Sequence, residues 1–322
     1  YNQDNSNLII IEKKNEVYIT VDCDSGVQRE ISEFFTFYVP GYKFMPAFRN
    51  RMWDGKIRLF SQKTKEIYFG LYPYIKAFAE ERGYNIVAGK DIDIDNKVDR
   101  DVVTKFSNSL GQKFEARDYQ IDAIFHSLKR NRALLVSPTA SGKSFIIYSL
   151  IRYYSHLIKE ESNNRILLIV PTTSLVEQMY TDFESYGWNV KKNCHRLYSG
   201  YSNQTDKKVL ISTWQSLYKL PKSYFEQFGC VFGDEAHLFK SKSLTEIMTK
   251  LIDCKYRIGL TGTLDGAHTH KLVLEGLFGA VNKVTTTKKL MDKNQLSNLV
   301  VRCLILKHSE ANAKIISKGK YQ

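Results

Sequence analysis

A short apolar run followed by a turn rich in glycine and serine most constrains the fold of this chain. Ala133–Val136 is typical of a buried strand, the loop Ser137–Ser144 follows it directly, and Phe145–Leu150 is compatible with a helix. A strand, a loop ending in Gly-Lys-Ser and a helix together place backbone N–H groups and a helix N-terminus around a phosphate. We therefore expect a phosphate-binding loop, although Ser137 stands where the usual pattern has glycine.

A pair of acidic residues follows a second apolar run. Asp234 and Glu235 come directly after Cys230–Gly233. In a nucleotide site, Lys143 would contact the β- and γ-phosphates, while Ser144 and Asp234 would hold Mg²⁺. Glu235 would orient or deprotonate the attacking water. Gly-Lys-Ser alone could mark an ordinary helix start, but together with the acid pair it favours a nucleotide-driven machine.

The composition is that of an intracellular globular protein. Of 322 residues, 43% are hydrophobic and 25% charged, and no apolar stretch approaches the ~20 residues of a membrane span. The five cysteines lack CxxC spacing, which favours a reducing compartment over metal or disulfide roles. The polar N-terminus lacks methionine, so we expect a trimmed fragment without a signal peptide.

One stretch of the first third combines basic and aromatic residues. Between Tyr42 and Lys65, seven lysines and arginines accompany one acid, Asp54, in a chain of net charge +13. Basic side chains can contact phosphates and aromatic rings can stack on bases, so this stretch is a candidate nucleic-acid surface. A solvated basic hairpin with its aromatics in the core is the alternative. The candidate contacts are Arg49, Arg51, Trp53, Lys56 and Arg58.

Apolar patterns divide the chain near residue 105. Before it they predict a small α+β unit, with strands at Leu8–Ile11, Val17–Val21 and Ile57–Phe60 and helices at Val27–Phe37 and Leu71–Arg82. The acid-rich segment Asp91–Asp101 is expected to be an exposed connector rather than a metal loop, because it lacks the glycine and terminal glutamate of a calcium site.

From Arg117 onward, short β-rich runs alternate with helical stretches. The predicted strands are Ala133–Ser137, Ile166–Pro171, Val209–Thr213, Cys230–Gly233 and Ile258–Thr261. This alternation predicts an α/β fold, a parallel sheet with helices on both faces. Ligands of such sheets gather at the carboxyl ends of the strands, where the loops named above emerge.

The loops at these strand ends resemble, in order, motifs Q, I, Ia, Ib/Ic, II and III of superfamily 2 helicases. They are Arg117–Gln120, Pro138–Ser144, Pro171–Leu175, Ser212–Gln215, Asp234–His237 and Thr261–Thr263. In the first third, Gly41–Phe44 and Trp53–Leu59 resemble the accessory domain of phage UvsW-type helicases, which remodel branched DNA. Thr285–Met291 resembles that family's exit from its first motor domain.

The resemblance implies a RecA-like motor fold preceded by a small α+β accessory domain. It implies an accessory DNA-binding domain at 1–105, a first motor domain at 106–283, and a linker with the start of a second motor domain at 284–322. The implied activity is that of an ATP-dependent DNA helicase or translocase with a DEAH box, acting on branched or duplex DNA with ATP and Mg²⁺ as cofactors. A monomer is favoured, and a phage-encoded member would work in the cytoplasm of the host cell.

The resemblance also assigns residues that the pattern alone leaves open. Gln120 would read the adenine edge with help from Arg117. His237 would lie between the nucleotide and a coupling pair, Thr261 and Thr263. The implied phosphate loop comprises Thr139, Ala140, Ser141, Gly142, Lys143 and Ser144. The implied contacts to the DNA strand are Thr172, Thr173, Thr213, Trp214 and Gln215, for which threonine N-capping and tryptophan packing are the alternatives.

The chain ends before the Gln-x-x-Gly-Arg-x-x-Arg motif of a second motor domain. Because an arginine finger contributes on the order of 10³–10⁵ to turnover, we expect this chain to bind ATP but to hydrolyse it weakly. Two alternatives stay open: an RNA helicase or restriction-type translocase of the same superfamily, and a nucleotide-gated DNA-binding module without motor activity. The first third lacks an RNA-binding motif, which favours DNA.

Overall fold

The computed structural model describes residues 7–238, 241–264, 268–293 and 295. The chain divides into two compact units, Tyr1–Thr286 and Thr287–Gln322. The second contains helix α13 (Thr287–Asp292), and most of the predicted second-domain start, with Cys303, lies outside the described residues. Among the described residues, no helix combines the length and apolar composition that crossing a bilayer requires.

A mixed four-stranded sheet, in the order β5-β2-β1-β6, forms the centre of the accessory region. Its strands are β1 (Leu8–Lys13), β2 (Tyr18–Asp22), β5 (Glu66–Tyr68) and β6 (Asn85–Ala88), and its helices are α1 (Ser25–Phe34) and α3 (Tyr72–Arg82). β1 pairs antiparallel with β2 and parallel with β6. The predicted strands at 8–11 and 17–21 and the predicted helix at 71–82 are therefore present, whereas the short strands β5 and β6 carry no pattern long enough to predict.

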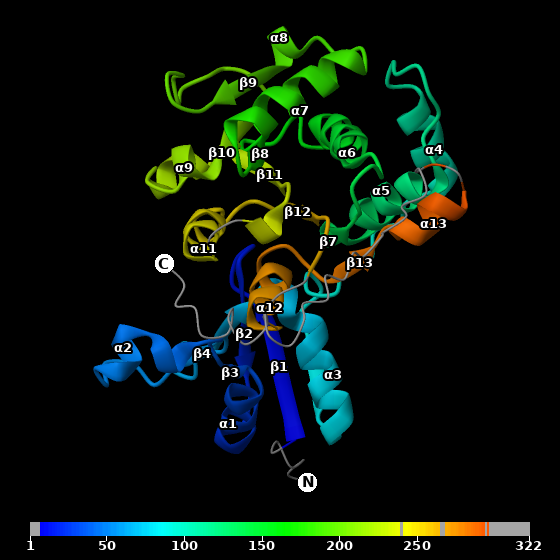
Figure 1. Ribbon diagram of the computed structural model, residues 1–322. Coiled ribbons are helices and arrows are strands. Elements are labelled where there is room, and N and C mark those ends of the chain that lie inside the picture. The colour runs from blue at the N-terminus through cyan, green and yellow to red at the C-terminus, as the bar shows by residue number, and fades with distance from the viewer. Residues whose placement is uncertain (1–6, 239–240, 265–267, 294, 296–322) are drawn as a thin grey trace, which may run out of the picture. The chain divides into compact units, whose positions relative to one another are not determined.

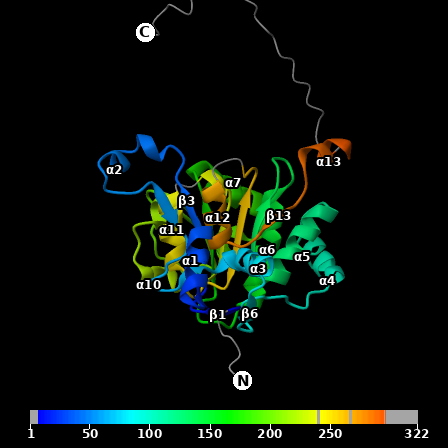
Figure 2. The same ribbon diagram turned by 90° about the horizontal axis from the view of Figure 1, so that it is seen from below.

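A separate hairpin carries the basic and aromatic stretch. β3 (Thr36–Tyr38) pairs antiparallel with β4 (Lys56–Arg58), and the connection holds the 3-10 turn η2 (Tyr42–Phe44) and helix α2 (Pro46–Arg49). In both views α2 projects away from the accessory sheet (Figures 1 and 2). The predicted helix Val27–Phe37 is wrong beyond Phe34, because Thr36 pairs with Arg58 and enters a strand.

A seven-stranded sheet forms the second region, and all its pairs are parallel. The order is β13 (Val281–Lys283), β7 (Arg132–Val136), β12 (Tyr256–Thr261), β11 (Phe228–Gly233), β8 (Arg165–Val170), β10 (Val209–Thr213) and β9 (Cys194–Leu197). The helices are α4 (Arg100–Asn108), α5 (Asp118–Arg130), α6 (Lys143–Leu157), α7 (Thr173–Ser185), α8 (Val190–Asn193), α9 (Trp214–Leu217), α10 (Lys222–Phe225), α11 (Ser241–Lys250) and α12 (His268–Leu277). The predicted α/β fold class is confirmed.

The two faces of this sheet bury different partners. Ala133 and Leu135 share a hydrophobic cluster with residues of α5, α6 and α7. Leu134, which points to the other face, shares a cluster with α11, α12 and the accessory core residues Ile9 and Ile31. Because successive strand residues point to opposite faces, the accessory region packs on one face and the helices that support the phosphate loop pack on the other. The predicted boundary near residue 105 thus separates two sheets that share one core.

Candidate functional site

The predicted phosphate loop leaves the carboxyl end of β7 and leads into α6. Ser137 and Ser141 are fully buried, and their hydroxyl oxygens lie 2.6 Å apart across the loop. Ala140 (φ +66°) and Gly142 (φ +79°) both have left-handed backbone conformations, which turn successive N–H groups inward. Serine therefore stands where the usual pattern has glycine because its hydroxyl closes the loop.

The residues of the predicted adenine motif hold this loop in place. Gln120 is buried; its Oε1 accepts a hydrogen bond from the Arg117 N–H at 2.9 Å, and its Nε2 donates to the Ser141 carbonyl at 2.9 Å. Tyr119 also donates to the Ser141 carbonyl, at 3.0 Å. A Cβ on Gly142 would lie 2.4 Å from the Gln120 Nε2, so a larger residue would displace this amide and would also be strained at φ +79°. The adenine-reading role of Gln120 stays a prediction.

Asp234 is the most deeply buried acid of the site. Its side chain is 2% exposed, and among the described residues nothing donates a hydrogen bond to its Oδ1. Burial raises its pKa from 3.8 to about 6; Lys143 opposes this shift and the neighbouring Glu235 adds to it. A buried carboxylate oxygen without a donor is a position that a cation would satisfy.

The second acid, Glu235, contacts residues from several loops of the site. It adopts a left-handed backbone conformation (φ +49°), and one carboxylate oxygen pairs with the Lys143 ammonium. The other oxygen accepts a hydrogen bond from the Gly262 N–H at 3.3 Å and lies 3.5 Å from Nδ1 of His237. Three loops that are far apart in the sequence, after β7, β11 and β12, thus meet on one side chain.

His237 and the predicted coupling pair continue this network. Thr261 Oγ1 lies 2.5 Å from the His237 Nδ1 and 2.6 Å from the Thr263 carbonyl oxygen. The Thr261 carbonyl accepts a hydrogen bond from the Ser137 N–H at 2.9 Å, which links the loop after β12 back to the phosphate loop. The resemblance places His237 between the nucleotide and the pair Thr261 and Thr263, and in the structure His237 contacts Thr261 directly.

The geometry fits a Mg²⁺-nucleotide. β7 and β11 are separated only by β12, and all three are parallel, so Ser144 and Asp234 follow strands that end at the same edge. The described residues contain no cluster of three or more histidine, cysteine or acidic side chains that could hold a metal ion. A magnesium site does not need one, because Mg²⁺ commonly takes one or two protein oxygens together with phosphate oxygens and water.

A basic–aromatic lobe, defined as residues 38–58, lies on the accessory hairpin. Phe44 and Met52 are 85% and 81% exposed, which is unusual for side chains of their size. Arg49 and Arg51 are exposed, and no acidic side chain of the described residues pairs with either. A shallow hollow of the lobe is lined by Lys43, Phe48, Arg49, Arg51, Met52, Trp53 and Asp54.

Comparisons with known proteins cover both regions. The family model "DNA helicase UvsW, N-terminal" matches residues 9–89, and "Type III restriction enzyme, res subunit" matches residues 113–266. The crystal structure of the UvsW helicase from bacteriophage T4 superposes with a TM-score of 0.77 at 34% identity, over 85% of this chain and 99% of that one. The chain belongs to the UvsW helicase family. The resemblance of its motifs is thereby confirmed.

Two relatives extend the comparison. The "ATP-dependent DNA helicase uvsW" of Enterobacteria phage T4 is 33% identical over 314 residues, which are 95% of this chain and 62% of that protein. The UvsW-family chain therefore spans less than two thirds of this relative's length. The "DNA 3'-5' translocase XPB2" of Sulfurisphaera tokodaii is 26% identical over 219 residues, which are 63% of this chain and 46% of that protein.

In this UvsW-family chain, the residues predicted to contact a DNA strand lie at the carboxyl ends of β8 and β10. Thr172 and Thr173 are exposed, and Thr172 caps α7 by accepting a hydrogen bond from the Leu175 N–H at 3.3 Å. Thr213 is buried with its Oγ1 3.1 Å from the Ser216 Oγ, and Trp214 packs on Tyr218 with ring centroids 5.9 Å apart. Gln215 is exposed. The capping and packing alternatives are thus realised, and DNA contact by these residues stays a prediction.

The lobe residues differ in how tightly they are held. Lys56 lies over the Tyr38 ring at 4.9 Å, and Arg58 forms an ion pair with Asp54. Trp53 donates a hydrogen bond from its indole nitrogen to the Lys56 carbonyl at 2.9 Å. These three side chains therefore have partners within the lobe, whereas the two arginines at 49 and 51 are the freer cations.

Sequence reasoning missed Tyr186 and Asp182. The Ser144 Oγ lies 2.8 Å from the Tyr186 hydroxyl, and Ser144 also hydrogen-bonds Asp182, whose pKa is raised by burial and held down in part by this bond. Both residues come from the end of α7, which carries no motif. Only the packing of α7 against α6 brings them to the Ser144 hydroxyl, so no local sequence pattern could have found them.

Proposed function

We propose that this chain contains the accessory domain (1–105) and first motor domain (106–283) of an ATP-dependent DNA helicase or translocase that remodels branched DNA. One observation carries the proposal: Lys143, Glu235 and Thr261 meet at one sheet edge, in the same compact unit as a lobe with free arginines. The printed name of the T4 relative, an ATP-dependent DNA helicase, supports it. We propose a monomer that works inside the host cell.

The nucleotide chemistry follows from the Lys143–Glu235 ion pair. Mg²⁺, when bound between Ser144 and Asp234, would neutralise charge on the phosphates of ATP. Lys143 would exchange its carboxylate partner for phosphate oxygens, beside the backbone amides of residues 139–144. That exchange frees one oxygen of Glu235 to accept a proton from the attacking water, while the Gly262 N–H holds the other oxygen. The ion pair thus keeps the base occupied until a triphosphate is in place.

The coupling chemistry follows from Thr261. His237 contacts both the general base Glu235 and Thr261, and Thr261 contacts Thr263. A change at the γ-phosphate position would therefore reach Thr261 and Thr263. The predicted DNA contacts at Thr172, Thr173, Thr213, Trp214 and Gln215 lie at the ends of β8 and β10 in the same parallel sheet, so a shift at this edge would affect them. Arg49, Arg51, Trp53, Lys56 and Arg58 of the lobe would hold the branched or duplex DNA.

The deciding experiment is ATP hydrolysis by the intact gene product with four-way, forked and linear duplex DNA and with RNA of equal length. We expect branched DNA to stimulate turnover by at least about tenfold over linear duplex, which is the effect of about 1.4 kcal/mol. Glu235→Gln should bind ATP with normal affinity and hydrolyse none. Strongest stimulation by RNA would identify an RNA helicase, and nucleotide-dependent DNA binding without turnover would identify a binding module.

One second candidate has its own support. The match of residues 113–266 to a type III restriction subunit favours translocation along unbranched duplex DNA. In that case stimulation should rise with the length of a linear duplex and should not change when a junction is introduced at constant length. Branch preference at constant length separates the two candidates.

A further inference from the structure

The last turn of α12 with the residue that follows it, Glu275–Phe278, lies against β11, which ends directly before the acid pair, and against β12. A Cβ built on Gly233 would lie 2.7 Å from the Phe278 ring, and one on Gly259 would lie 2.8 Å from it. Gly233 is the residue directly before Asp234, and Gly259 lies in β12, the strand that ends at Thr261. The Phe278 ring, which is fully buried, thus packs directly on the backbone of both strands.

The same turn contacts the accessory region on its other side. A Cβ on Gly70 would lie 1.9 Å from the Glu275 carbonyl oxygen, and one on Gly276 would lie 2.8 Å from the Tyr68 Cβ. No other residue type fits at either position without a backbone shift. Helix α12 contacts β5 of the accessory sheet and β7 of the seven-stranded sheet.

The Glu275 carboxylate links helix α3 of the accessory region to strand β13 by hydrogen bonds. Glu275 is 4% exposed; its Oε2 accepts from the Tyr74 hydroxyl at 2.6 Å and its Oε1 accepts from the Val281 N–H at 3.2 Å. Tyr74 belongs to α3 of the accessory region and Val281 begins β13 of the seven-stranded sheet. Hydrogen bonds to a buried charged group are among the stronger ones in proteins, and such a group is costly to leave without a partner.

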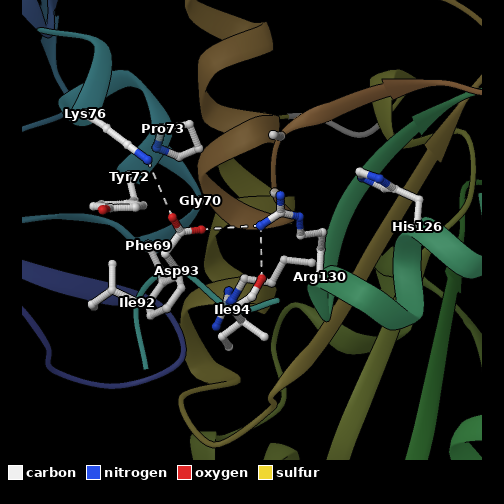
Figure 3. A pocket seen from close by; sticks show the side chains of 13 residues that line it. Phe69, Gly70, Tyr72, Pro73, Lys76, Ile92, Asp93, Ile94, His126 and Arg130 are labelled. Carbon is white, nitrogen blue, oxygen red and sulfur yellow. Dashed lines mark hydrogen bonds and ion pairs between the residues drawn. The ribbon is translucent and has the colours of Figure 1, made fainter. Parts of the chain in front are cut away.

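Other polar contacts between the accessory region and the region of the seven-stranded sheet are either buried or exposed. Buried Arg132 of β7 pairs with Glu16 before β2, and the Glu16 N–H donates to the Ile252 carbonyl at 2.8 Å. At the mouth of a cavity of about 330 Å³ between α3 and α5, Asp93 lies 3.7 Å from Lys76 and 3.3 Å from Arg130 (Figure 3). The pairs of Asp93 are exposed and therefore weak. The buried contacts hold the two sheets together.

The N-terminal end of α12 reaches the hairpin that carries the lobe. The His268 ring lies 5.3 Å from the ring of Phe37, which is in β3. The α12 segment therefore contacts β11 and β12 near its C-terminal end, helix α3 of the accessory region through Glu275, and the lobe hairpin at its first residue. A packed interior has few voids and transmits displacements, so a shift of β11 or β12 would move this helix and the hairpin with it.

We propose that α12 couples the nucleotide site to the basic–aromatic lobe, and that Tyr74 and Glu275 are positioning residues that make the accessory region follow the helix. The inference rests on the proposed function and adds a second route by which nucleotide binding affects DNA binding. Thr261 and Thr263 would affect DNA bound at the edge of the seven-stranded sheet, whereas α12 would affect DNA bound by the accessory region. Nucleotide binding then changes the affinity of the lobe for DNA, and DNA bound at the lobe changes nucleotide affinity by the same factor.

The test measures this factor on the 322-residue chain. Binding of a fluorescent forked DNA is titrated with and without a saturating Mg²⁺ complex of a non-hydrolysable ATP analogue. The wild-type chain should show a change in DNA dissociation constant of at least about fivefold, the lower end of usual coupling. Tyr74→Phe should bring the factor below about twofold, while the affinity for each ligand alone stays unchanged, because Tyr74 touches neither site.

Tyr84→Phe is the matched control. It removes a tyrosine-to-glutamate hydrogen bond of 3.0 Å to Glu30, but both residues belong to the accessory region, so the coupling factor should stay at the wild-type value. Glu275→Gln keeps one acceptor oxygen for two donors and should give an intermediate factor. A merely structural role would lower the thermal stability of both tyrosine variants alike and leave the factor intact.

The outcomes separate this inference from the proposed function. The role of α12 is overturned if Tyr74→Phe keeps the wild-type coupling factor. It is also overturned if the wild-type chain binds both ligands normally but nucleotide does not change its DNA dissociation constant. Either result leaves the proposed function standing. Failure of the wild-type chain to bind the ATP analogue or DNA overturns both. Loss of coupling in Tyr74→Phe with full coupling in Tyr84→Phe supports the inference.

Discussion

The proposed nucleotide site and the basic–aromatic lobe differ in how far their side chains are exposed to solvent and held by partners. In the proposed nucleotide site, Lys143, Glu235 and His237 are half-buried, and each has a partner that fixes its position. In the lobe, Phe44, Met52 and the two free arginines are exposed. A triphosphate is small and is enclosed, so its site has to be preorganised. A DNA backbone is long and uniform, so cations on a projecting hairpin are enough to bind it.

This contrast explains why the two regions differ in how they depend on the rest of the fold. The acid pair needs three parallel strands to end at one edge, and a small shift of one strand would break the Lys143–Glu235 contact. The lobe depends on one two-stranded hairpin and its local turns. The nucleotide site should therefore respond sharply to single substitutions, and the lobe should respond gradually.

The sharpest test of the contrast is Lys143→Ala. Removing the ammonium group that we propose to bind the phosphates should lower ATP turnover of the intact gene product by at least about 100-fold, as removal of one preorganised charge-stabilising group does elsewhere. Turnover is measured with saturating DNA. Lys159→Ala, an exposed lysine just after α6, is the control and should leave turnover unchanged. Undiminished turnover in Lys143→Ala would remove the phosphate role.

The burial of Asp234 gives the next largest effect. Its pKa is raised from 3.8 to about 6, so the folded chain takes up a proton between these values and its stability falls as pH rises through that window. Asp234→Asn should therefore stabilise the ligand-free chain at pH 7.5 by up to about 3 kcal/mol, and this gain should vanish near pH 4. Urea unfolding at both pH values measures it.

The control for that experiment is Asp206→Asn, which changes an exposed aspartate. Its stability should stay within about 0.5 kcal/mol of wild type at either pH. If Asp234→Asn gave no gain at pH 7.5, the carboxylate would have to be solvated or paired, and burial would not be raising its pKa.

The lobe should show the smallest effect of a substitution. Replacing Arg49 and Arg51 by alanine together should weaken DNA binding about tenfold and should lower the slope of log affinity against log salt by about 2, because each phosphate contact contributes roughly 0.9. The affinity for nucleotide alone should not change. Lys191→Ala with Lys192→Ala on α8 removes the same charge beside edge strand β9 and should leave the slope at its wild-type value. An unchanged slope in the arginine variant would show that the lobe does not bind the backbone.

Several elements followed from local patterns. The apolar runs at 133–137, 166–171 and 209–213 are strands of the parallel sheet, as their composition predicts. The short strands β9 and β13 were not predicted: β9 mixes buried and half-buried residues, and β13 has only three residues. Such edge strands are defined by the neighbour they pair with, β10 for one and β7 for the other.

Some residues of the candidate site could be predicted from the sequence, and others could not. The sequence placed Lys143, Ser144, Asp234 and Glu235 in one site because each follows a strand-like run, and parallel strands end together. It gave no sign of Tyr186 beside Ser144. It also assigned Gln120 to a nucleotide base, without the contact with Ser141 by which this amide supports the phosphate loop.

The α/β fold class, the order of the loops and the chemical character of the proposed nucleotide site could be predicted, because they depend on residues within a few positions of one another. The core that the accessory sheet shares with the seven-stranded sheet could not, and neither could the contacts of Gly70, Tyr74 and Glu275 that connect the two regions through α12. Tyr74 and Glu275 are far apart in the chain. Their contact depends on the packing of whole elements, which no local pattern encodes.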